Sequence, residues 1–195
     1  MKKLTKDCKT RECLMKSFVG EGAGRNRYTY FAKVAKEEGY EQISAIFLET
    51  ADNERAHAKR FFKFLGEEFE DINISEISYP AGLSKSTVNN LQFAANGEHE
   101  ENTVLYPSFA KTAEEEGYIE IADNYHEIIE VEQIHEQRYL DLMNNILEDK
   151  VFKCDKEVIW KCRNCGYHHK GKEAPPVCPA CKHPTAYFEL FVKNY

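Results

Sequence analysis

The stretch "ETADNERAH", Glu49–His57, places Glu54 and His57 three residues apart, on one face of any helix that contains them. The stretch "EIIEVEQIH", Glu127–His135, repeats this spacing with Glu132 and His135. Both pairs lie in the middle of apolar stripes at helical spacing. An unpaired buried carboxylate is costly, so each stripe predicts a partner of opposite charge in the protein interior.

The two stretches belong to an internal repeat. Residues 28–64 and 106–142 align at an offset of 78 with fourteen identities. Gly39 and Gly117 are expected to end the first helix of each repeat as C′ residues. We predict helices at about 10–38, 41–66, 85–116 and 119–149, with Thr10 and either Ser84 or Ser86 as N-caps. Short turns within the repeats and a long connection near 67–84 favour an all-α four-helix bundle with one long crossover between the second and third helices.

Each predicted helix directs at least one glutamate inward. This pattern meets the established template of di-iron carboxylate bundles, in which two helices each supply one Glu and two others each supply Glu-x-x-His. A single Glu-x-x-His usually lies on a solvated face, but two copies in register on apolar stripes favour metal binding. Carboxylate and imidazole ligands suit iron or manganese, with Glu54 and Glu132 bridging two cations. The predicted ligands are Glu21, Glu54, His57, Glu98, Glu101, Glu132 and His135. Glu101 exceeds the template, either as a variable ligand or as an acid/base group.

Tyr28 and Tyr106 are equivalent in the repeat and lie about two turns from Glu21 and Glu98. They serve either in core packing or in hydrogen bonds to the metal-binding carboxylates. Glu21 and Tyr28 are seven residues apart, whereas Glu98 and Tyr106 are eight residues apart. The extra residue predicts a π-bulge in the third helix, a feature often found at functional sites.

The composition changes near residue 150, where prolines and cysteines become frequent. We predict a helical domain at 1–150, a linker at 151–156 and a small metal-stapled β/loop domain at 157–195. Two C-x-x-C pairs predict one tetrahedral site formed by Cys162, Cys165, Cys178 and Cys181. Zinc would make this site structural, and iron would make it a one-electron carrier. We interpret Cys8, Cys13 and Cys154 as incidental thiols.

Bulk properties limit the possible partners. The chain has 195 residues and a net charge of −7, without a long basic tract, which argues against nucleic-acid binding. Apolar runs are too short for a membrane span, and the basic N-terminus is not followed by an apolar signal region. We therefore expect a cytoplasmic protein. The sequence contains no G-x-G-x-x-G motif for binding a dinucleotide.

Taken together, the motifs resemble the rubrerythrin family over nearly the whole chain. The segments that carry the resemblance are "GEGAGRNRYTYF" (20–31), "ETADNERAH" (49–57), "GEHEENTVLYPSFA" (97–110), "EVEQIHE" (130–136), "WKCRNCGY" (160–167) and "CPACKHP" (178–184). The resemblance implies a ferritin-like bundle with a non-haem di-iron centre, followed by a rubredoxin-like domain with one iron held by four cysteines.

The resemblance also implies an oxidative-stress peroxidase that reduces hydrogen peroxide to water. Its rubredoxin-like iron would deliver electrons one at a time, drawn from NADH only through a separate reductase. The catalytic residues would be the seven predicted ligands together with Tyr28 and Tyr106, and one iron would exchange its ligand between Glu101 and His57 on redox change. The family forms homodimers in which the rubredoxin-like domain of one subunit approaches the di-iron site of the other.

Two other functions remain open on the sequence. One is a ferroxidase or iron-handling protein, although a storage protein needs no attached electron donor. The other is a structural bundle with a zinc ribbon that serves as an interaction module.

Overall fold

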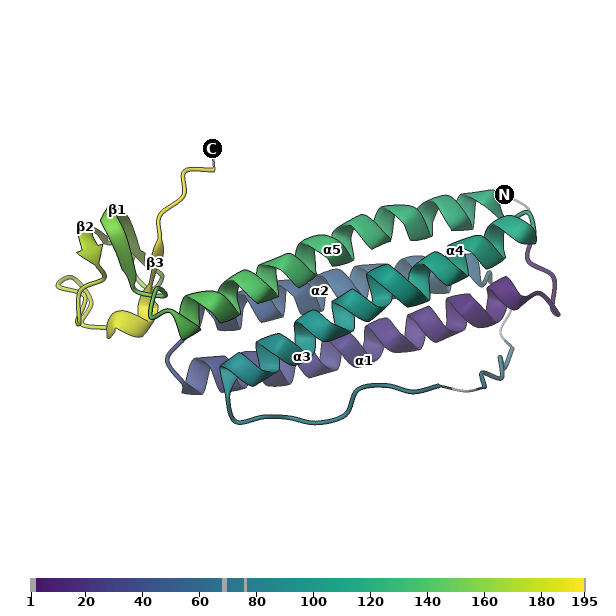
Figure 1. The fold of residues 1–195 in the computed structure, drawn as a ribbon, viewed down its shortest axis with the longest axis horizontal. Helices are drawn as coiled ribbons and strands as arrows, with labels where there is room; N and C mark the ends of the chain where they lie inside the picture. Colours follow the sequence, from purple (N-terminus) through teal and green to yellow (C-terminus); the bar gives the residue numbers. More distant parts are fainter. Residues whose placement is uncertain (1–2, 68–69, 76, 195) are drawn as a thin grey trace.

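The computed structural model describes residues 3–67, 70–75 and 77–194. A long bundle of helices is followed by a small domain with a β-sheet at one end of the bundle (Figure 1). Within the described ranges, no helix is both long enough and apolar enough to cross a membrane. The predicted bundle with one long crossover is confirmed.

The bundle is formed by α1 (Lys9–Glu37), α2 (Glu41–Phe64), α3 (Thr87–Glu100), the π-helix η1 (Glu101–Leu105), α4 (Tyr106–Glu115) and α5 (Ile119–Leu147). Helices α3, η1 and α4 follow one another without a break and together form the third long helix (Figure 1). The connection after α2 returns along the length of the bundle, so that α2 and the third helix run in the same direction. The predicted helix ends lie within about two residues of those observed, as expected for frayed termini.

The turns within the two repeats have the same backbone geometry. Gly39 and Gly117 have φ angles of 85° and 76°, which favour glycine. The N–H of Gly39 donates to the carbonyl of Lys36, and the N–H of Tyr40 donates to that of Ala35. These two bonds satisfy carbonyls at the end of α1 and turn the chain directly into α2.

The start of α1 differs from the prediction. The N-cap is Cys8, not Thr10, and Cys8 makes no side-chain capping bond. The carboxylate of Glu116 instead accepts hydrogen bonds from the N–H groups of Lys9 and Thr10, each at 2.9 Å. A side chain more than 100 positions away in sequence therefore caps α1, and it joins the start of α1 to the end of α4.

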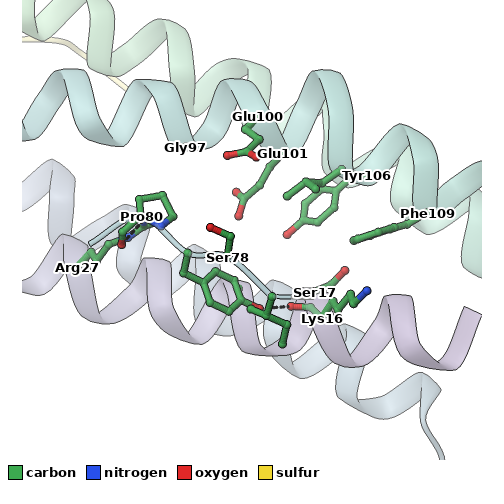
Figure 2. A pocket seen from close by; sticks show the side chains of 14 residues that line it. Lys16, Ser17, Arg27, Ser78, Pro80, Gly97, Glu100, Glu101, Tyr106 and Phe109 are labelled. Carbon is green, nitrogen blue, oxygen red and sulfur yellow. Dashed lines mark hydrogen bonds between the residues drawn. The ribbon is translucent and has the colours of Figure 1, made fainter. Parts of the chain in front are cut away.

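The crossover is fixed against α1. The hydroxyl of Tyr79 donates a hydrogen bond of 3.0 Å to the carbonyl of Lys16 (Figure 2). The crossover chain passes between α1 and the third helix at this point, near Glu101 on η1. Residues 77–80 have no regular secondary structure.

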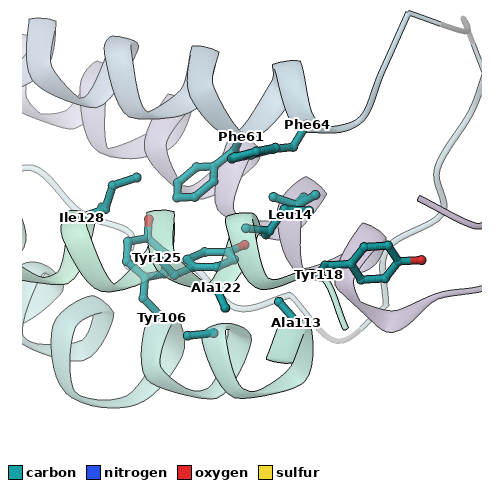
Figure 3. Packing of buried hydrophobic residues seen from close by; sticks show 11 residues of the cluster. Leu14, Phe61, Phe64, Tyr106, Ala113, Tyr118, Ala122, Tyr125 and Ile128 are labelled. Atoms are coloured by element: carbon teal, nitrogen blue, oxygen red, sulfur yellow. The ribbon is translucent and has the colours of Figure 1, made fainter. Parts of the chain in front are cut away.

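Two apolar clusters fill the bundle. The first contains Leu14, Phe61, Tyr106, Tyr125 and Ile128 (Figure 3). The second contains Tyr28, Phe31, Phe47, Leu91 and Tyr139, among others. Polar residues at the middle of the helices lie between these clusters. Apolar packing therefore holds four helices around a polar centre.

The small domain has a three-stranded antiparallel sheet in the order β2-β1-β3. Its strands are β1 (Lys153–Cys162), β2 (His168–Glu173) and β3 (Phe188–Leu190), with a short 3-10 helix at Thr185–Tyr187. Trp160 and Phe188 form its core together with two cysteines. Because α5 ends at Leu147 and β1 begins at Lys153, part of the segment expected as the linker 151–156 lies in a strand.

Candidate metal centres

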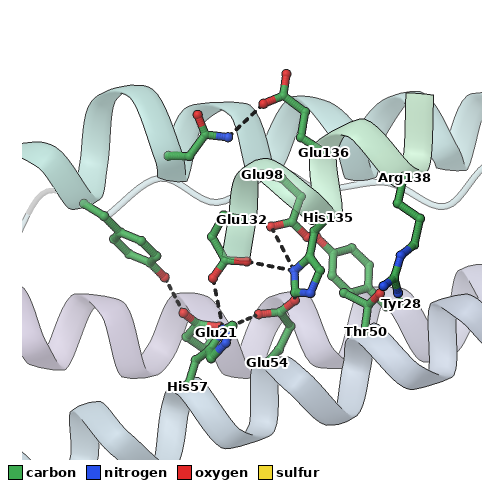
Figure 4. Close-up of polar contacts among 12 residues, drawn as sticks. Glu21, Tyr28, Thr50, Glu54, His57, Glu98, Glu132, His135, Glu136 and Arg138 are labelled. Carbon is green, nitrogen blue, oxygen red and sulfur yellow. Dashed lines mark hydrogen bonds and ion pairs between the residues drawn. The ribbon is translucent and has the colours of Figure 1, made fainter. Parts of the chain in front are cut away.

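Six of the predicted ligands converge at the middle of the bundle (Figure 4). The first group consists of Glu21, Glu54, His57 and Glu132, and the second consists of Glu54, Glu98, Glu132 and His135. Within each group, the potential ligand atoms lie within 4.8 Å of one another. Glu54 and Glu132 belong to both groups, the arrangement expected of two carboxylates that bridge two metal ions.

The two histidines occupy equivalent positions on opposite sides of the bridging pair. Nδ1 of His57 lies 3.0 Å from Oε1 of Glu132 and 3.2 Å from Oε2 of Glu54. Nδ1 of His135 lies 2.8 Å from Oε2 of Glu132 and 3.4 Å from Oε1 of Glu54. Each imidazole therefore faces a different oxygen of each bridging glutamate, which follows from the repeat of Glu-x-x-His on α2 and α5.

The cluster contains more buried polar atoms than its hydrogen bonds satisfy. Among the described residues, Oε2 of Glu21, Oε1 of Glu54, Oε2 of Glu98, both Oε atoms of Glu132 and Nδ1 of His135 are buried without a hydrogen-bond partner. Nδ1 of His135 therefore lies close to carboxylate oxygens, but these contacts do not have the geometry of hydrogen bonds. Leaving such groups unsatisfied is costly. Four ionised carboxylates would balance two divalent cations, so this donor set fits a two-metal centre.

Burial and mutual repulsion govern the protonation of this cluster. Burial, followed by the charge of Glu54, raises the pKa of Glu21 and of Glu98 well above the ordinary value. Burial alone would lower the pKa of His135, but Glu132 and Glu54 raise it to about 9. For Glu54, burial acts to raise the pKa, but contacts with the two histidines lower it. Without cations the cluster would therefore hold protons, which metal ions displace on binding.

The tyrosines connect the two repeats crosswise. The hydroxyl of Tyr28 on α1 donates to Oε1 of Glu98 on α3, and that of Tyr106 on α4 donates to Oε1 of Glu21 on α1. Both bonds measure 2.5 Å, and both tyrosines are buried. Both roles considered for these tyrosines are observed: their rings pack in the apolar clusters, and their hydroxyls bind candidate ligands. Each hydrogen bond leaves Oε2 of its glutamate without a partner.

Glu101 lies outside both groups. It begins η1, in which the N–H of Tyr106 donates to the carbonyl of Glu101, five residues earlier. The predicted π-bulge is therefore confirmed. Oε1 of Glu101 lies toward Gly20 on α1 and the aromatic ring of Tyr79 on the crossover. In this arrangement His57 lies within the cluster and Glu101 stands beside it.

The four cysteines form the second candidate centre. The Sγ atoms of Cys162 and Cys181 are 3.7 Å apart, as are those of Cys165 and Cys178. A tetrahedral metal–sulfur bond of about 2.3 Å requires sulfur–sulfur distances of about 3.8 Å, so the site is already shaped for a metal. The backbone N–H of His183 lowers the pKa of the Cys181 thiol to about 5, which favours the thiolate that binds metal.

The two centres differ in exposure. Cys162 and Cys178 are buried, whereas Cys165 is exposed and Cys181 is half-buried. One edge of the four-cysteine site therefore faces solvent. The carboxylate cluster is enclosed by helices, with Glu21, Glu54, Glu98 and Glu132 almost inaccessible.

Sequence reasoning missed contacts made between distant segments. Glu136 on α5 binds the amide of Asn102 at 2.8 Å and the imidazole of His99 at 2.9 Å. It thereby fixes the region where α3 passes into η1. Tyr79 was also missed, because nothing in the local pattern of the crossover indicates which helix it contacts.

The fold and both clusters define a class of iron proteins in which a ferritin-like carboxylate bundle is joined to a four-cysteine domain. The Rubrerythrin family model matches residues 12–143, and the model of the rubrerythrin rubredoxin-like domain matches residues 160–189. The chain belongs to the rubrerythrin family.

Two curated rubrerythrins match over their full length. The chain is 57% identical to Rubrerythrin-1 of Clostridium acetobutylicum and 50% identical to rubrerythrin of Nitratidesulfovibrio vulgaris, covering 99% of this chain and 100% of the relative in both cases. A structure of mixed-valence nigerythrin has a TM-score of 0.62 at 32% identity, covering 96% of this chain and 92% of the other. A ferritin from Archaeoglobus fulgidus, at 16% identity and a TM-score of 0.63 over 76% of this chain and 88% of the other, shows the fold alone.

Both clusters match the iron sites of rubrerythrin and nigerythrin. Their donor sets fit two irons in a carboxylate-bridged centre and one iron in a tetrahedral four-cysteine site. The family and the fold identify an iron-dependent oxidoreductase of oxidative-stress defence.

Proposed function

We propose that this protein is a non-haem di-iron peroxidase that reduces hydrogen peroxide to water. The observation that carries the proposal is the presence, in one chain, of an enclosed two-metal cluster and a four-cysteine site with a solvent-facing edge. Hydrogen peroxide, two electrons and two protons give two waters. When bound, two ferrous irons supply both electrons and the positive charge that stabilises developing anionic oxygen.

The protein side chains keep this chemistry in place. Tyr28 and Tyr106 hold one oxygen of Glu98 and one of Glu21, so that the free oxygens keep a fixed direction. Glu101 lies beside the cluster, where its carboxyl group is placed to hold a proton for the departing oxygen. The apolar clusters on either side exclude bulk water. By family resemblance, one iron would exchange its ligand between Glu101 and His57 on redox change.

Electron return is assigned to the four-cysteine iron, one electron at a time. From His135 to the end of α5 at Leu147 the helix rises roughly 18 Å, at about 1.5 Å per residue, and the four-cysteine domain lies beyond that end (Figure 1). The distance within one chain supports a homodimer in which the partner's four-cysteine site approaches the cluster. The electrons would come from a separate reductase.

The experiment that tests this proposal compares oxidants. Fully reduced protein is mixed anaerobically with hydrogen peroxide and, separately, with dioxygen, while absorption reports oxidation of each iron site. Faster oxidation by peroxide supports the peroxidase. Much faster oxidation by dioxygen would instead indicate a ferroxidase, and a colourless zinc protein would indicate a structural module.

A substitution separates the two centres. Glu54→Ala removes a bridging carboxylate and should abolish peroxide reduction while the ferric-thiolate spectrum persists. Glu130→Ala, an exposed glutamate on α5, is the matched control and should retain full activity. Equal activity in the two variants would contradict the assignment of the cluster.

A further inference from the structure

A cavity of about 90 Å³ lies between α1, the crossover and the third helix (Figure 2). Its walls include Gly20, Arg27, Tyr79, Glu101, Tyr106 and Phe109. A water molecule needs roughly 10–15 Å³ of such space, so the cavity holds several water-sized groups. Its wall is mainly apolar, and the charged and hydroxyl groups in it can bind a small polar molecule.

The inner wall of this cavity adjoins the carboxylate cluster. Tyr106 lines the cavity, and its hydroxyl donates directly to Glu21, a member of the cluster. Gly20 precedes Glu21 on α1 and also lines the cavity. The Glu101 carboxylate projects into the space from the third helix (Figure 2). A molecule in the cavity therefore meets the Glu101 carboxylate directly, and the side chain of Tyr106 lies between it and Glu21.

The outer wall is a single layer of crossover chain. Ile77, Ser78 and Pro80 are exposed, whereas Tyr79 is half-buried and held to the carbonyl of Lys16. A Cβ atom added at Gly20 would lie 3.5 Å from the ring of Tyr79 and 3.9 Å from Oε1 of Glu101. The missing side chain of Gly20 thus keeps open the space between Tyr79 and Glu101.

We propose that this cavity is the access route from solvent to the carboxylate–histidine cluster, and that Tyr79 is the residue that restricts it to molecules the size of hydrogen peroxide. The proposal rests on the proposed function for its substrate. A cavity that holds benzene measures roughly 150 Å³, so cumene hydroperoxide, which contains a benzene ring and further carbons, exceeds this space. Tyr79 and Gly20 act on access and take no part in the bond-breaking step.

The first experiment enlarges the route. The iron-loaded wild type should reduce hydrogen peroxide far faster than cumene hydroperoxide. Tyr79→Ala should raise the rate with cumene hydroperoxide relative to hydrogen peroxide by on the order of tenfold. Tyr30→Ala, which removes a largely exposed tyrosine of the same helical bundle, is the control and should leave the ratio unchanged. An unchanged ratio in Tyr79→Ala would overturn the role of Tyr79.

The second experiment narrows the route and does not depend on peroxide chemistry. Nitric oxide binds ferrous iron, and its rate of association with the fully reduced protein is followed by visible absorption. Gly20→Val should slow association severalfold, whereas Gly22→Val should not, because a Cβ atom at Gly22 meets nothing within 4 Å. Gly20→Ala provides a smaller change should the valine variant fail to fold.

The two experiments separate the two proposals. Slow reduction of hydrogen peroxide by the wild type would refute the proposed function. The access route would still be established if substitution of Gly20 slowed the binding of nitric oxide. Equal association rates in the Gly20 and Gly22 variants would overturn the route, whatever the substrate.

Discussion

Four buried tyrosines in the bundle differ in what their hydroxyl groups contact. This difference predicts that replacing each of them with phenylalanine lowers the free energy of unfolding by a different amount. Tyr28, Tyr106, Tyr125 and Tyr139 are each at most 2% exposed. The hydroxyls of Tyr28 and Tyr106 donate to carboxylates. That of Tyr125 pairs with the hydroxyl of Ser17 at 2.9 Å, and that of Tyr139 has no hydrogen-bond partner among the described residues.

The expected costs follow from these partners. A hydrogen bond to a charged group contributes about 1.5–3 kcal/mol, and a neutral one contributes about 0.5–1.5 kcal/mol. Tyr28→Phe and Tyr106→Phe should therefore lower the free energy of unfolding by about 1.5–3 kcal/mol each, and Tyr125→Phe by about 0.5–1.5 kcal/mol. Tyr139→Phe should be neutral or stabilising, because it removes an unsatisfied buried polar atom.

Thermal unfolding of the iron-loaded protein, followed by helical circular dichroism, measures the series. At about 2–4 °C per kcal/mol for a chain of this size, Tyr28→Phe and Tyr106→Phe should lower Tm by about 3–12 °C. Tyr139→Phe is the matched control, since it removes the same atom at the same depth. A Tm loss in Tyr139→Phe equal to that in Tyr28→Phe would refute the reasoning, because it would show that the hydroxyl contacts do not set the cost.

Three further predictions concern other parts of the chain. Glu116→Ala should lower the free energy of unfolding by about 0.5–2 kcal/mol, the usual cost of a lost N-cap. Burial acts to raise the pKa of Glu116, but hydrogen bonds from Thr10 and Lys9 lower it below its ordinary value of 4.5. The difference in free energy of unfolding between Glu116→Ala and the wild type, measured by urea titration, should therefore have its full size above pH 4.5. It should disappear as the pH falls through the lowered pKa of Glu116 in the folded protein. Burial raises the pKa of the Cys13 thiol to about 11, so at pH 8 roughly one thousandth of this thiol is ionised. Mass spectrometry should therefore find Cys13 unlabelled by maleimide until the protein is denatured. Rapid labelling of Cys13 in the folded protein would contradict the prediction. Trp160 is the one tryptophan of the chain and is buried. Removing the metal from the four-cysteine site should shift its fluorescence emission to longer wavelength, while the helical circular dichroism signal is retained. A simultaneous loss of the helical signal would show that the two domains unfold as one unit.

The repeat made much of the bundle predictable. Helical periodicity is local, so the helix ends, the glycine turns and the inward faces of Glu54 and Glu132 followed from the sequence. The π-helix also followed, because the two repeats differ by one residue between glutamate and tyrosine. Glu101, which the sequence offered either as a variable ligand or as an acid/base group, lies beside the cluster at the start of the π-helix and outside both groups of candidate ligands.

Contacts between distant segments were not predictable. The capping of α1 by Glu116, the crosswise pairing of each tyrosine with a glutamate of the other repeat, and the contact of Tyr79 with α1 all join residues more than 60 positions apart. Each depends on how helices align after folding, which periodicity does not encode. The cavity beside Glu101 depends on the same alignment and was equally absent from the sequence pattern.

The π-helix at Glu101–Leu105 has a consequence for the symmetry of the molecule. Two similar halves supply one glutamate, one Glu-x-x-His pair and one tyrosine each, which by itself would make two interchangeable metal positions. Only the second half carries an additional carboxylate, Glu101, at the start of this π-helix, and the cavity beside it is closed by the crossover. The two sides of the centre are therefore chemically distinct, although the helices that supply their ligands are repeats of one another: a small molecule that arrives through the cavity meets the side that carries Glu101.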